Sequence, residues 1–135
     1  MFKRLIVLFT GILTFFHLLA GSCQHPYQQG QALYELNCQR CHGDDGEGFE
    51  DLYPSINESP FLSNTESLSC LIVYGSDYLR GQQASDAATI MPDNLHLTSV
   101  EVLNIVNYLS FKMGDGRQDA IEKVTRGLEK CAPEK

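Results

Sequence analysis

The chain has 135 residues, a length that suits one modest domain. Hydrophobic residues make up 43% and charged residues 20%, which is an ordinary balance for a globular protein. The formal net charge is −7 and there is no block of basic residues, so the composition argues against nucleic acid as a partner.

The first 22 residues have the pattern of an export signal. Lys3 and Arg4 precede an almost entirely apolar stretch over residues 5–20, and small residues follow it. The stretch is short for a membrane-spanning helix, which needs about 20 apolar residues, and an uncleaved membrane anchor is the alternative interpretation. We expect a cleaved signal peptide over residues 1–22 and an exported mature protein in the periplasm or cell envelope.

The end of this signal is compatible with two kinds of processing. Residues 20–22, Ala-Gly-Ser, suit an ordinary signal peptidase. The segment "LAGSC" is also similar to the lipobox of bacterial lipoproteins, with Ala20 where those proteins usually carry a branched aliphatic residue. The chain has an odd number of cysteines, and lipid on Cys23 would leave the other four as two pairs. We expect lipid on Cys23, with acyl chains that tether the mature protein to a membrane.

The mature chain is strongly acidic. Cleavage after residue 22 removes Lys3 and Arg4 and no acidic residue, which leaves eight basic and 17 acidic residues, a net charge of −9. Such a charge favours solubility and allows attraction to a basic docking patch on a partner protein.

The mature chain is expected to be all helical, with a short tether over residues 23–29 ahead of the first helix. Helical spacing of apolar residues predicts four helices, over 30–41, 64–74, 99–113 and 117–130. No segment alternates apolar and polar residues over a convincing strand length. Two long loops separate helices, and a small domain with such loops is expected to fold around something other than its own side chains.

Local signals predict the ends and buried faces of the first two helices. In the first helix, Tyr34 is expected to flank an apolar face that comprises Ala32, Leu33 and Leu36. At the second helix, Ser63 and Glu66 form a capping-box pattern and Gly75 is a C-terminal stop. Cys70 is expected on a different side from the buried stripe, which consists of Leu68, Leu71 and Ile72.

The two later helices carry the same kinds of signal. Thr98 and Glu101 repeat the capping-box pattern at the start of the third helix, and Gly114 ends it. The apolar residues of this helix at helical spacing are Val102, Ile105, Val106 and Leu109. In the last helix, Cys131 continues the apolar face made by Ile121, Val124 and Leu128.

The segment "CQRCH", Cys38 to His42, is the attachment signature of c-type haem. Two thiols one helical turn apart can bond to the two vinyl groups of a porphyrin, and the histidine that follows is placed to ligate the iron. Export agrees with this interpretation, since such attachment takes place outside the cytoplasm. Cys38, Cys41 and His42 are therefore the predicted attachment and ligation residues of one covalent haem c.

Three other kinds of site share the Cys-x-x-Cys pattern. A thioredoxin-like redox pair belongs to a βαβ context, whereas a helix and a glycine-rich loop flank this pair. A zinc site needs four ligands, commonly from two such pairs, and Cys70 and Cys131 are lone residues far apart in the sequence. A structural disulfide between Cys38 and Cys41 leaves His42 unexplained.

A haem iron with His42 on one side needs a ligand on the other, and four residues of the mature chain have suitable side chains. Met91 precedes a proline in an irregular stretch between two helices, where a stiff loop can present a thioether to a ring. His96 is the main rival and would give a bis-histidine centre. Met113 is expected to be a core residue, and His25 lies in the tether.

The chain resembles the class I monohaem cytochromes c of the small bacterial type over residues 30–113. The matching features, in chain order, are a helix with Gly30 and Tyr34, "CQRCHG", "DGEG", "YPSI", a middle helix, "MP" and a closing helix with Tyr108. The resemblance implies an all-α cytochrome c fold around one haem, in which the first and closing helices cross with Gly30 against Tyr108. It also implies that the carbonyl of Pro54 accepts the imidazole proton.

Two features lie outside the pattern of that family. Residues 115–135 continue past the domain of residues 30–114 as a helical C-terminal extension, and Cys70 and Cys131 are additional thiols. Because an exported chain with two spare thiols favours a bond, we expect a Cys70–Cys131 disulfide that clamps the extra helix to the middle one. Two unpaired thiols are the alternative.

The resemblance implies a one-electron carrier with a His/Met-ligated haem c rather than an enzyme. Its partners are expected to be membrane-associated redox proteins with a basic docking patch. Two alternatives stay open. One is the electron-entry subunit of a larger oxidoreductase or oxidase complex, and the other is a haem-based sensor or gas-binding protein with a displaceable Met ligand.

Overall fold

The structure, a computed structural model, describes residue 11 and residues 26–50, 52–80 and 91–132. The expected signal peptide, Cys23 and most of the tether lie outside these ranges. The described chain contains α2 (Gln28–Asn37), α3 (Gln39–His42), the short 3-10 helix η1 (Pro60–Ser63), α4 (Thr65–Arg80), α5 (Ser99–Met113) and α6 (Ile121–Cys131). An isolated bridge between Phe49 and Tyr53 is the one β feature of the described ranges, so the all-α prediction is confirmed. None of the helices described here is long and apolar enough to cross a bilayer.

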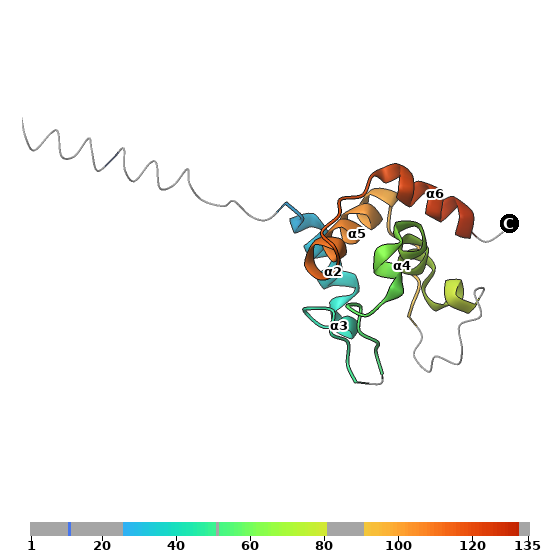
Figure 1. The fold of residues 1–135 in the computed structure, drawn as a ribbon, viewed down its shortest axis with the longest axis horizontal. Coiled ribbons are helices and arrows are strands. Elements are labelled where there is room, and N and C mark those ends of the chain that lie inside the picture. The colour runs from blue at the N-terminus through green and yellow to red at the C-terminus, as the bar shows by residue number, and fades with distance from the viewer. Residues whose placement is uncertain (1–10, 12–25, 51, 81–90, 133–135) are drawn as a thin grey trace, which may run out of the picture.

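Two helix pairs build the molecule (Figure 1). α2 packs across α5 and α6 packs along α4, while α5 also contacts both α4 and α6. In the view of Figure 1, α6 lies at the opposite end from α3. The core between the helices is formed by buried side chains that include Tyr34, Leu68, Ile72, Val102, Ile105, Val106, Leu109 and Val124.

The contact between α2 and α5 depends on Gly30. A Cβ atom at this position would lie 2.1 Å from the carbonyl oxygen of Asn104 and 2.7 Å from Cβ of Tyr108, so only glycine lets the helices approach this closely. Beside it, the ring centroids of Tyr34 and Tyr108 are 5.5 Å apart. The expected packing of Gly30 against Tyr108 is therefore present.

The first helix differs from the prediction in its bounds and in its buried face. It begins at Gln28 and is interrupted at Cys38, whose φ of −121° separates α2 from α3. Leu36, which was expected on the apolar face, is 80% exposed, and Ala32 is exposed as well. The helix turns Gly30 and Tyr34 to the core instead, because the close approach to α5 decides which face points inward.

The residue that caps the start of α4 also differs from the prediction. Asn64, and not Ser63, caps this helix, since Asn64 Oδ1 accepts from the backbone N–H of Ser67 at 3.1 Å. Ser63 ends η1, and its hydroxyl donates to the carbonyl oxygen of Pro60 at 3.0 Å. The predicted capping partner Glu66 forms ion pairs with α6 instead.

Two faces of α4 are buried, one more than predicted. Leu68 and Ile72 are buried as expected, while Leu71 is half-buried. Ser69 and Cys70 are also buried, because α6 packs along this helix. The regular part of α4 ends at Gly75, as predicted, and further helical residues follow as far as Arg80.

α5 agrees with the prediction. Thr98 and Glu101 form a reciprocal capping box, and Gly114 follows the last helical residue. The apolar residues expected at helical spacing are all buried: Val102, Ile105, Val106 and Leu109. Met113 is partly buried and packs against the core, as expected for a core residue.

The C-terminal helix begins at Ile121 rather than at residue 117. The residues before it are held outside a helix around Asp119, whose side chain is 1% exposed. Its carboxylate accepts hydrogen bonds from Thr65 Oγ1 at 2.5 Å, from Arg117 Nε at 2.9 Å and from Lys123 Nζ at 2.8 Å. The Asp119 backbone N–H donates to Asn107 Oδ1 of α5 at 2.7 Å, so contacts distant in the sequence explain the later start.

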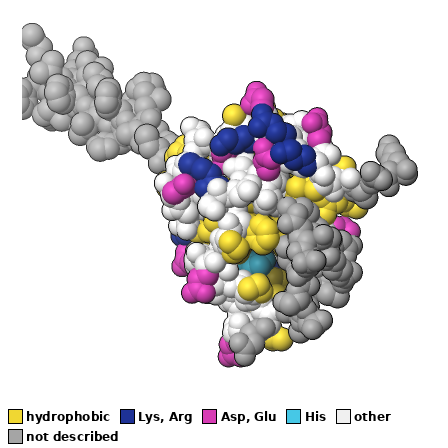
Figure 2. Space-filling model, turned by 45° about the vertical axis from the view of Figure 1, so that its right-hand side comes forward, with side chains coloured by type: hydrophobic (Ala, Val, Ile, Leu, Met, Phe, Trp, Pro, Cys, Tyr) yellow, Lys and Arg dark blue, Asp and Glu magenta, His cyan; other side chains and the backbone are white. Residues whose placement is uncertain are grey.

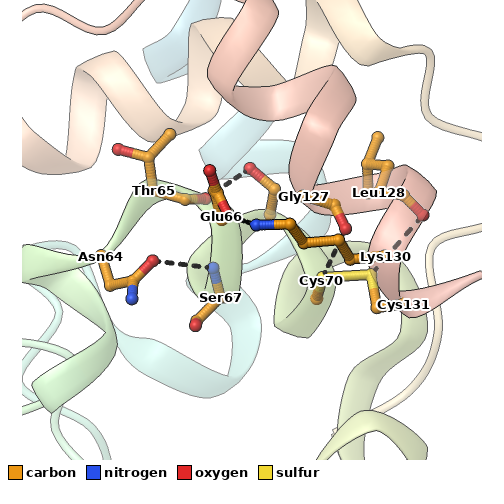
Figure 3. The surroundings of a disulfide bond; sticks show 10 residues. Asn64, Thr65, Glu66, Ser67, Cys70, Gly127, Leu128, Lys130 and Cys131 are labelled. Carbon is orange, nitrogen blue, oxygen red and sulfur yellow. Dashed lines mark hydrogen bonds and ion pairs between the residues drawn. A yellow bond between two sulfur atoms is a disulfide. The ribbon is translucent and has the colours of Figure 1, made fainter.

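A disulfide and two ion pairs fix α6 to α4 (Figure 3). Cys70 and Cys131 are bonded, with their Cα atoms 6.0 Å apart, which is the pairing expected from the sequence. Beside this bond, Glu66 of α4 accepts from Lys130 at 2.5 Å. Glu66 also accepts from Arg126 at 3.4 Å. The extra helix is thus packed along the middle one.

Candidate functional site

The two thiols and the imidazole of the "CQRCH" segment lie within one turn of chain. Cys38 occupies the break between α2 and α3, and Cys41 and His42 end α3. The backbone N–H groups of Cys41 and His42 both donate to the carbonyl oxygen of Cys38, at 3.1 and 3.0 Å, so the two cysteines stand one turn apart. Both thiols are free and half-buried.

The Cys38 thiol does not have the properties of an activated nucleophile. Burial, together with the neighbouring Cys41, raises the pKa of Cys38 to about 11, so this thiol is protonated at neutral pH. A catalytic dithiol has a lowered pKa instead. Cys38 therefore does not match the activated thiol of a catalytic dithiol pair.

His42 is held in one tautomer by Pro54. Nδ1 lies 3.3 Å from the carbonyl oxygen of Pro54, and because a carbonyl only accepts, the proton is on Nδ1 and Nε2 keeps its lone pair. Burial lowers the pKa of His42, and the bond to Pro54 opposes this effect without cancelling it. The ring is thus mainly neutral at pH 7, which is the form that a metal-ligating histidine takes.

The loop between His42 and Pro54 folds back through local bonds. The N–H of Gly48 donates to the carbonyl of His42 at 2.9 Å. The hydroxyl of Tyr34 donates to the carbonyl of Gly43 at 2.6 Å, which ties the loop to α2. Burial raises the pKa of Tyr34, so its hydroxyl stays a donor at any ordinary pH. These contacts let a segment without regular structure place the Pro54 carbonyl at the imidazole.

Met91, the expected second ligand, is fixed by its backbone to Ser76, directly after the regular part of α4 ends at Gly75. Its N–H donates to Ser76 Oγ at 2.7 Å, and its carbonyl oxygen accepts from the Ser76 N–H at 3.0 Å. Gly75 has a φ of +57°, and a Cβ atom there would lie 2.3 Å from the Met91 carbonyl oxygen, so this approach requires glycine. Met91 itself is half-buried.

Asn94 holds the same segment three residues further along. Its backbone N–H donates to the carbonyl of Val73 at 2.8 Å, and its side-chain amide donates to the carbonyl of Ile72 at 2.9 Å. Asn94 is 8% exposed, so these bonds are shielded from water. We call residues 91–94 the Met91 strap, because both of its ends are bonded to the end of the regular part of α4.

The rival ligands have other contacts or lie outside the described residues. His96 is exposed, and its Nε2 donates to Asn37 Oδ1 of α2 at 3.2 Å. The thioether of Met113 lies against Gly46, where a Cβ atom would be 2.5 Å from Sδ. His25 is not among the described residues. Met91 therefore stays the predicted ligand.

Two residues that hold the Met91 strap were missed by sequence reasoning: Ser76 and Asn94. Serine and asparagine are ordinary residues of turns and helix ends, so their presence in a loop carries little signal. The pair Gly75-Ser76 indicates the end of a helix, but no spacing rule relates it to a methionine 15 residues later.

The donor set fits one covalent haem. Its thiols are free and one turn apart, its imidazole has an available Nε2, and the half-buried Met91 lies on an anchored strap. Attachment and axial ligation of a c-type haem need these groups in this order along the chain.

The sequence model of the family described as Cytochrome c matches residues 27–110, more than half of the chain. The chain belongs to the cytochrome c family. This cytochrome accordingly has one covalently bound c-type haem and functions in haem-based electron transfer. The matched range contains α2, α3, α4 and most of α5, and it ends before α6.

A curated relative of this cytochrome is the fructose dehydrogenase cytochrome subunit of Gluconobacter japonicus. The two sequences are 32% identical over 107 residues. The alignment covers 73% of this chain and 22% of the relative. The cytochrome thus spans about a fifth of the relative's length, and the likeness concerns that part alone.

Proposed function

We propose that this cytochrome is a one-electron carrier whose haem c is bonded to Cys38 and Cys41 and ligated by His42 and Met91. The observation that carries the proposal is the bond from His42 Nδ1 to Pro54, which leaves Nε2 available directly after two free thiols. A haem c with two protein ligands exchanges one electron and offers no open position to a substrate.

The residues of the chain prepare that chemistry in three ways. The Pro54 carbonyl fixes the ring orientation of His42 and increases the basicity of its Nε2. The thioether of Met91 favours the reduced state and so raises the reduction potential. The strap that carries Met91 is bonded to α4 at both ends, so little rearrangement is expected between the two redox states.

Absorption spectroscopy of the mature protein tests this ligand set. A weak ferric band toward the red end of the spectrum is the signature of a thioether ligand. We expect the band in the wild type and in His96→Ala, and we expect its loss in Met91→Ala. A band that survives in Met91→Ala would assign the ligand to another residue.

We propose a redox partner with a basic docking patch. Residues 30–114 hold 12 acidic and three basic residues, a net charge of −9, whereas residues 115–135 hold five of each. On the face drawn in Figure 2, basic side chains gather toward the top with acidic ones among them, and further acidic side chains lie at the left and the bottom. The acidic haem domain is thus the part that would attract a cationic surface.

The salt dependence of electron exchange tests this charge argument. We expect the rate with a cationic complex such as hexaammineruthenium to fall as salt is added, and the rate with anionic ferricyanide to rise. Both trends follow from screening over a Debye length of about 8 Å at physiological ionic strength. The opposite trends would contradict a basic partner.

A second candidate is the electron-entry subunit of a larger oxidoreductase. The observation that favours it is the 32% identity to the fructose dehydrogenase cytochrome subunit. Co-purification with a larger redox protein at constant stoichiometry from native membranes would support this candidate. Migration of the cytochrome as a free protein in the same preparation would contradict it.

We propose export with cleavage after residue 22 and lipid on Cys23, ahead of a tether that is shorter than expected because α2 begins at Gln28. The disulfide uses Cys70 and Cys131 and the haem would use Cys38 and Cys41, which leaves Cys23 as the fifth cysteine. We expect the wild type in the membrane fraction with acyl mass on Cys23, and Cys23→Ser in the soluble fraction. Equal partition of both proteins would refute the lipid anchor.

A further inference from the structure

We propose that Ser76 is the positioning residue for Met91, and that its hydroxyl limits how often the iron loses its thioether ligand. The inference rests on the proposed His42/Met91 ligation. It concerns a residue that lies 15 positions before Met91 in the sequence and belongs to another element, α4.

Ser76 binds both backbone polar groups of Met91. The Met91 N–H donates to Ser76 Oγ at 2.7 Å, and the Met91 carbonyl oxygen accepts from the Ser76 N–H at 3.0 Å. Two bonds from one residue fix both the position and the rotation of the Met91 backbone. The direction in which the thioether leaves the strap therefore depends on Ser76.

The conformation of Gly75 makes this pair of bonds possible. Its φ of +57° and ψ of −145° interrupt the helix, so the N–H of Ser76 is turned to the strap. The strap comes so near that a Cβ atom at Gly75 would lie 2.3 Å from the carbonyl oxygen of Met91 and 2.6 Å from that of Pro92. The interruption of α4 at Gly75 thus lets the strap pack directly against this helix.

Asn94 holds the other end of the strap without help from Ser76. Its bonds go to the carbonyls of Val73 and Ile72, which precede Gly75 in α4. Loss of the Ser76 hydroxyl should therefore leave the strap attached at Asn94 and loosen it at the residue that carries the thioether. We expect Ser76→Ala to fold and to keep its haem bonded to Cys38 and Cys41.

Competition with an added ligand measures this loosening. Imidazole can bind the iron only when Met91 has left it, so the apparent affinity for imidazole is proportional to the fraction of molecules with Met91 detached. The loss of one typical intramolecular hydrogen bond changes such an equilibrium about fivefold. We expect Ser76→Ala to bind imidazole about fivefold more tightly than the wild type.

The experiment is an imidazole titration of the ferric holoprotein, followed in the haem absorption bands. Ser76→Thr keeps a hydroxyl and should bind imidazole like the wild type. The matched control is Ser69→Ala on the same helix, because the Ser69 hydroxyl donates to the Thr65 carbonyl at 2.7 Å and does not bond to the strap. Met91→Ala should bind imidazole most tightly and sets the upper limit.

The variants separate the failure of this inference from the failure of the ligand assignment. Unchanged imidazole affinity in Met91→Ala would remove Met91 as the ligand, and the role of Ser76 with it. Tight binding in Met91→Ala together with wild-type affinity in Ser76→Ala would overturn the role of Ser76 alone. Equal tightening in Ser69→Ala and Ser76→Ala would assign the effect to general destabilisation and would also overturn it.

Discussion

Replacement of Asp119 by asparagine tests what fixes the C-terminal helix to the cytochrome domain. The carboxylate is 1% exposed and lies 2.9 Å from Arg117 Nε and 2.8 Å from Lys123 Nζ. Removal of one partner of a buried ion pair costs about 3–5 kcal/mol. The side chains of Arg117 and Lys123 are 21% and 53% exposed, so water can solvate both cations after the substitution. We therefore expect Asp119→Asn to cost about 3 kcal/mol, the lower end of this range.

Thermal unfolding of the holoprotein, followed by circular dichroism, measures this loss. A loss of about 3 kcal/mol in the free energy of unfolding corresponds to a melting temperature that is lower by roughly 10–20 °C in a domain of this size. The matched control is Asp115→Asn, since Asp115 pairs with the same Arg117 at 3.2 Å but is 64% exposed. We expect the control to lose less than about 1 kcal/mol, and equal losses in both variants would refute the argument from burial.

The stability difference between the wild type and Asp119→Asn should also depend on pH, in a direction set by the pKa of Asp119. Burial acts to raise the pKa of Asp119, but the hydrogen bonds from Lys123, Thr65 and Arg117 outweigh it and hold the pKa below its ordinary value of 3.8. The contribution of Asp119 is therefore complete above this value and is lost as the pH falls through it toward the folded-state pKa. The stability difference between wild type and Asp119→Asn should be constant near neutral pH and shrink below about pH 4. A difference that grows on acidification would contradict the sign.

Three further predictions concern single contacts, each measured by urea unfolding. Gly30→Ala would place a Cβ atom 2.1 Å from the carbonyl oxygen of Asn104, and we expect a loss of about 2–3 kcal/mol or more. Ser110→Ala removes a buried hydroxyl that has no hydrogen-bond partner among the described residues, so we expect stability to be unchanged or higher by up to about 1 kcal/mol. Replacement of both Cys70 and Cys131 by serine removes a cross-link between residues 61 positions apart, and we expect a loss of about 4 kcal/mol.

Each of these predictions has its own control or contrary outcome. Gly116→Ala is the control for Gly30→Ala, because Gly116 has a φ of +73° but open space around it, and it should cost only about 1–2 kcal/mol. A loss well above 1 kcal/mol in Ser110→Ala would show that the hydroxyl has a partner. For the double serine variant, free thiols at Cys70 and Cys131 in the non-reduced wild type would remove the basis of the prediction.

Features that depend on local pattern could be predicted from the sequence. The capping box and the four buried apolar residues of α5 lie within a few turns of one helix, so periodicity alone locates them. The spacing of Cys38, Cys41 and His42 indicates haem attachment, since the chemistry itself requires that order. The pairing of Cys70 with Cys131 followed from the number of thiols rather than from geometry.

Periodicity and other local signals could not predict features that depend on contacts between distant segments, and the contacts of Gly30 with Tyr108 and of Pro54 with His42 were expected only from the family resemblance. Leu36 has the right period for a core residue, but the approach of α5 at Gly30 turns it to the outside. Residues 117–120 have a helical pattern, but Thr65 and Asn107 hold Asp119 outside a helix. The bonds between Ser76 and Met91 belong to the same class, because no local pattern relates this serine to a methionine 15 residues later.

The most direct test of the proposed site is the intact mass and the visible spectrum of the exported protein after denaturation. We expect a coloured polypeptide heavier by one haem, with the added mass on the peptide that contains Cys38 and Cys41. Replacement of both cysteines by serine should abolish this mass while the Cys70–Cys131 disulfide remains. A folded, colourless protein with the bare polypeptide mass would contradict covalent haem attachment at this segment.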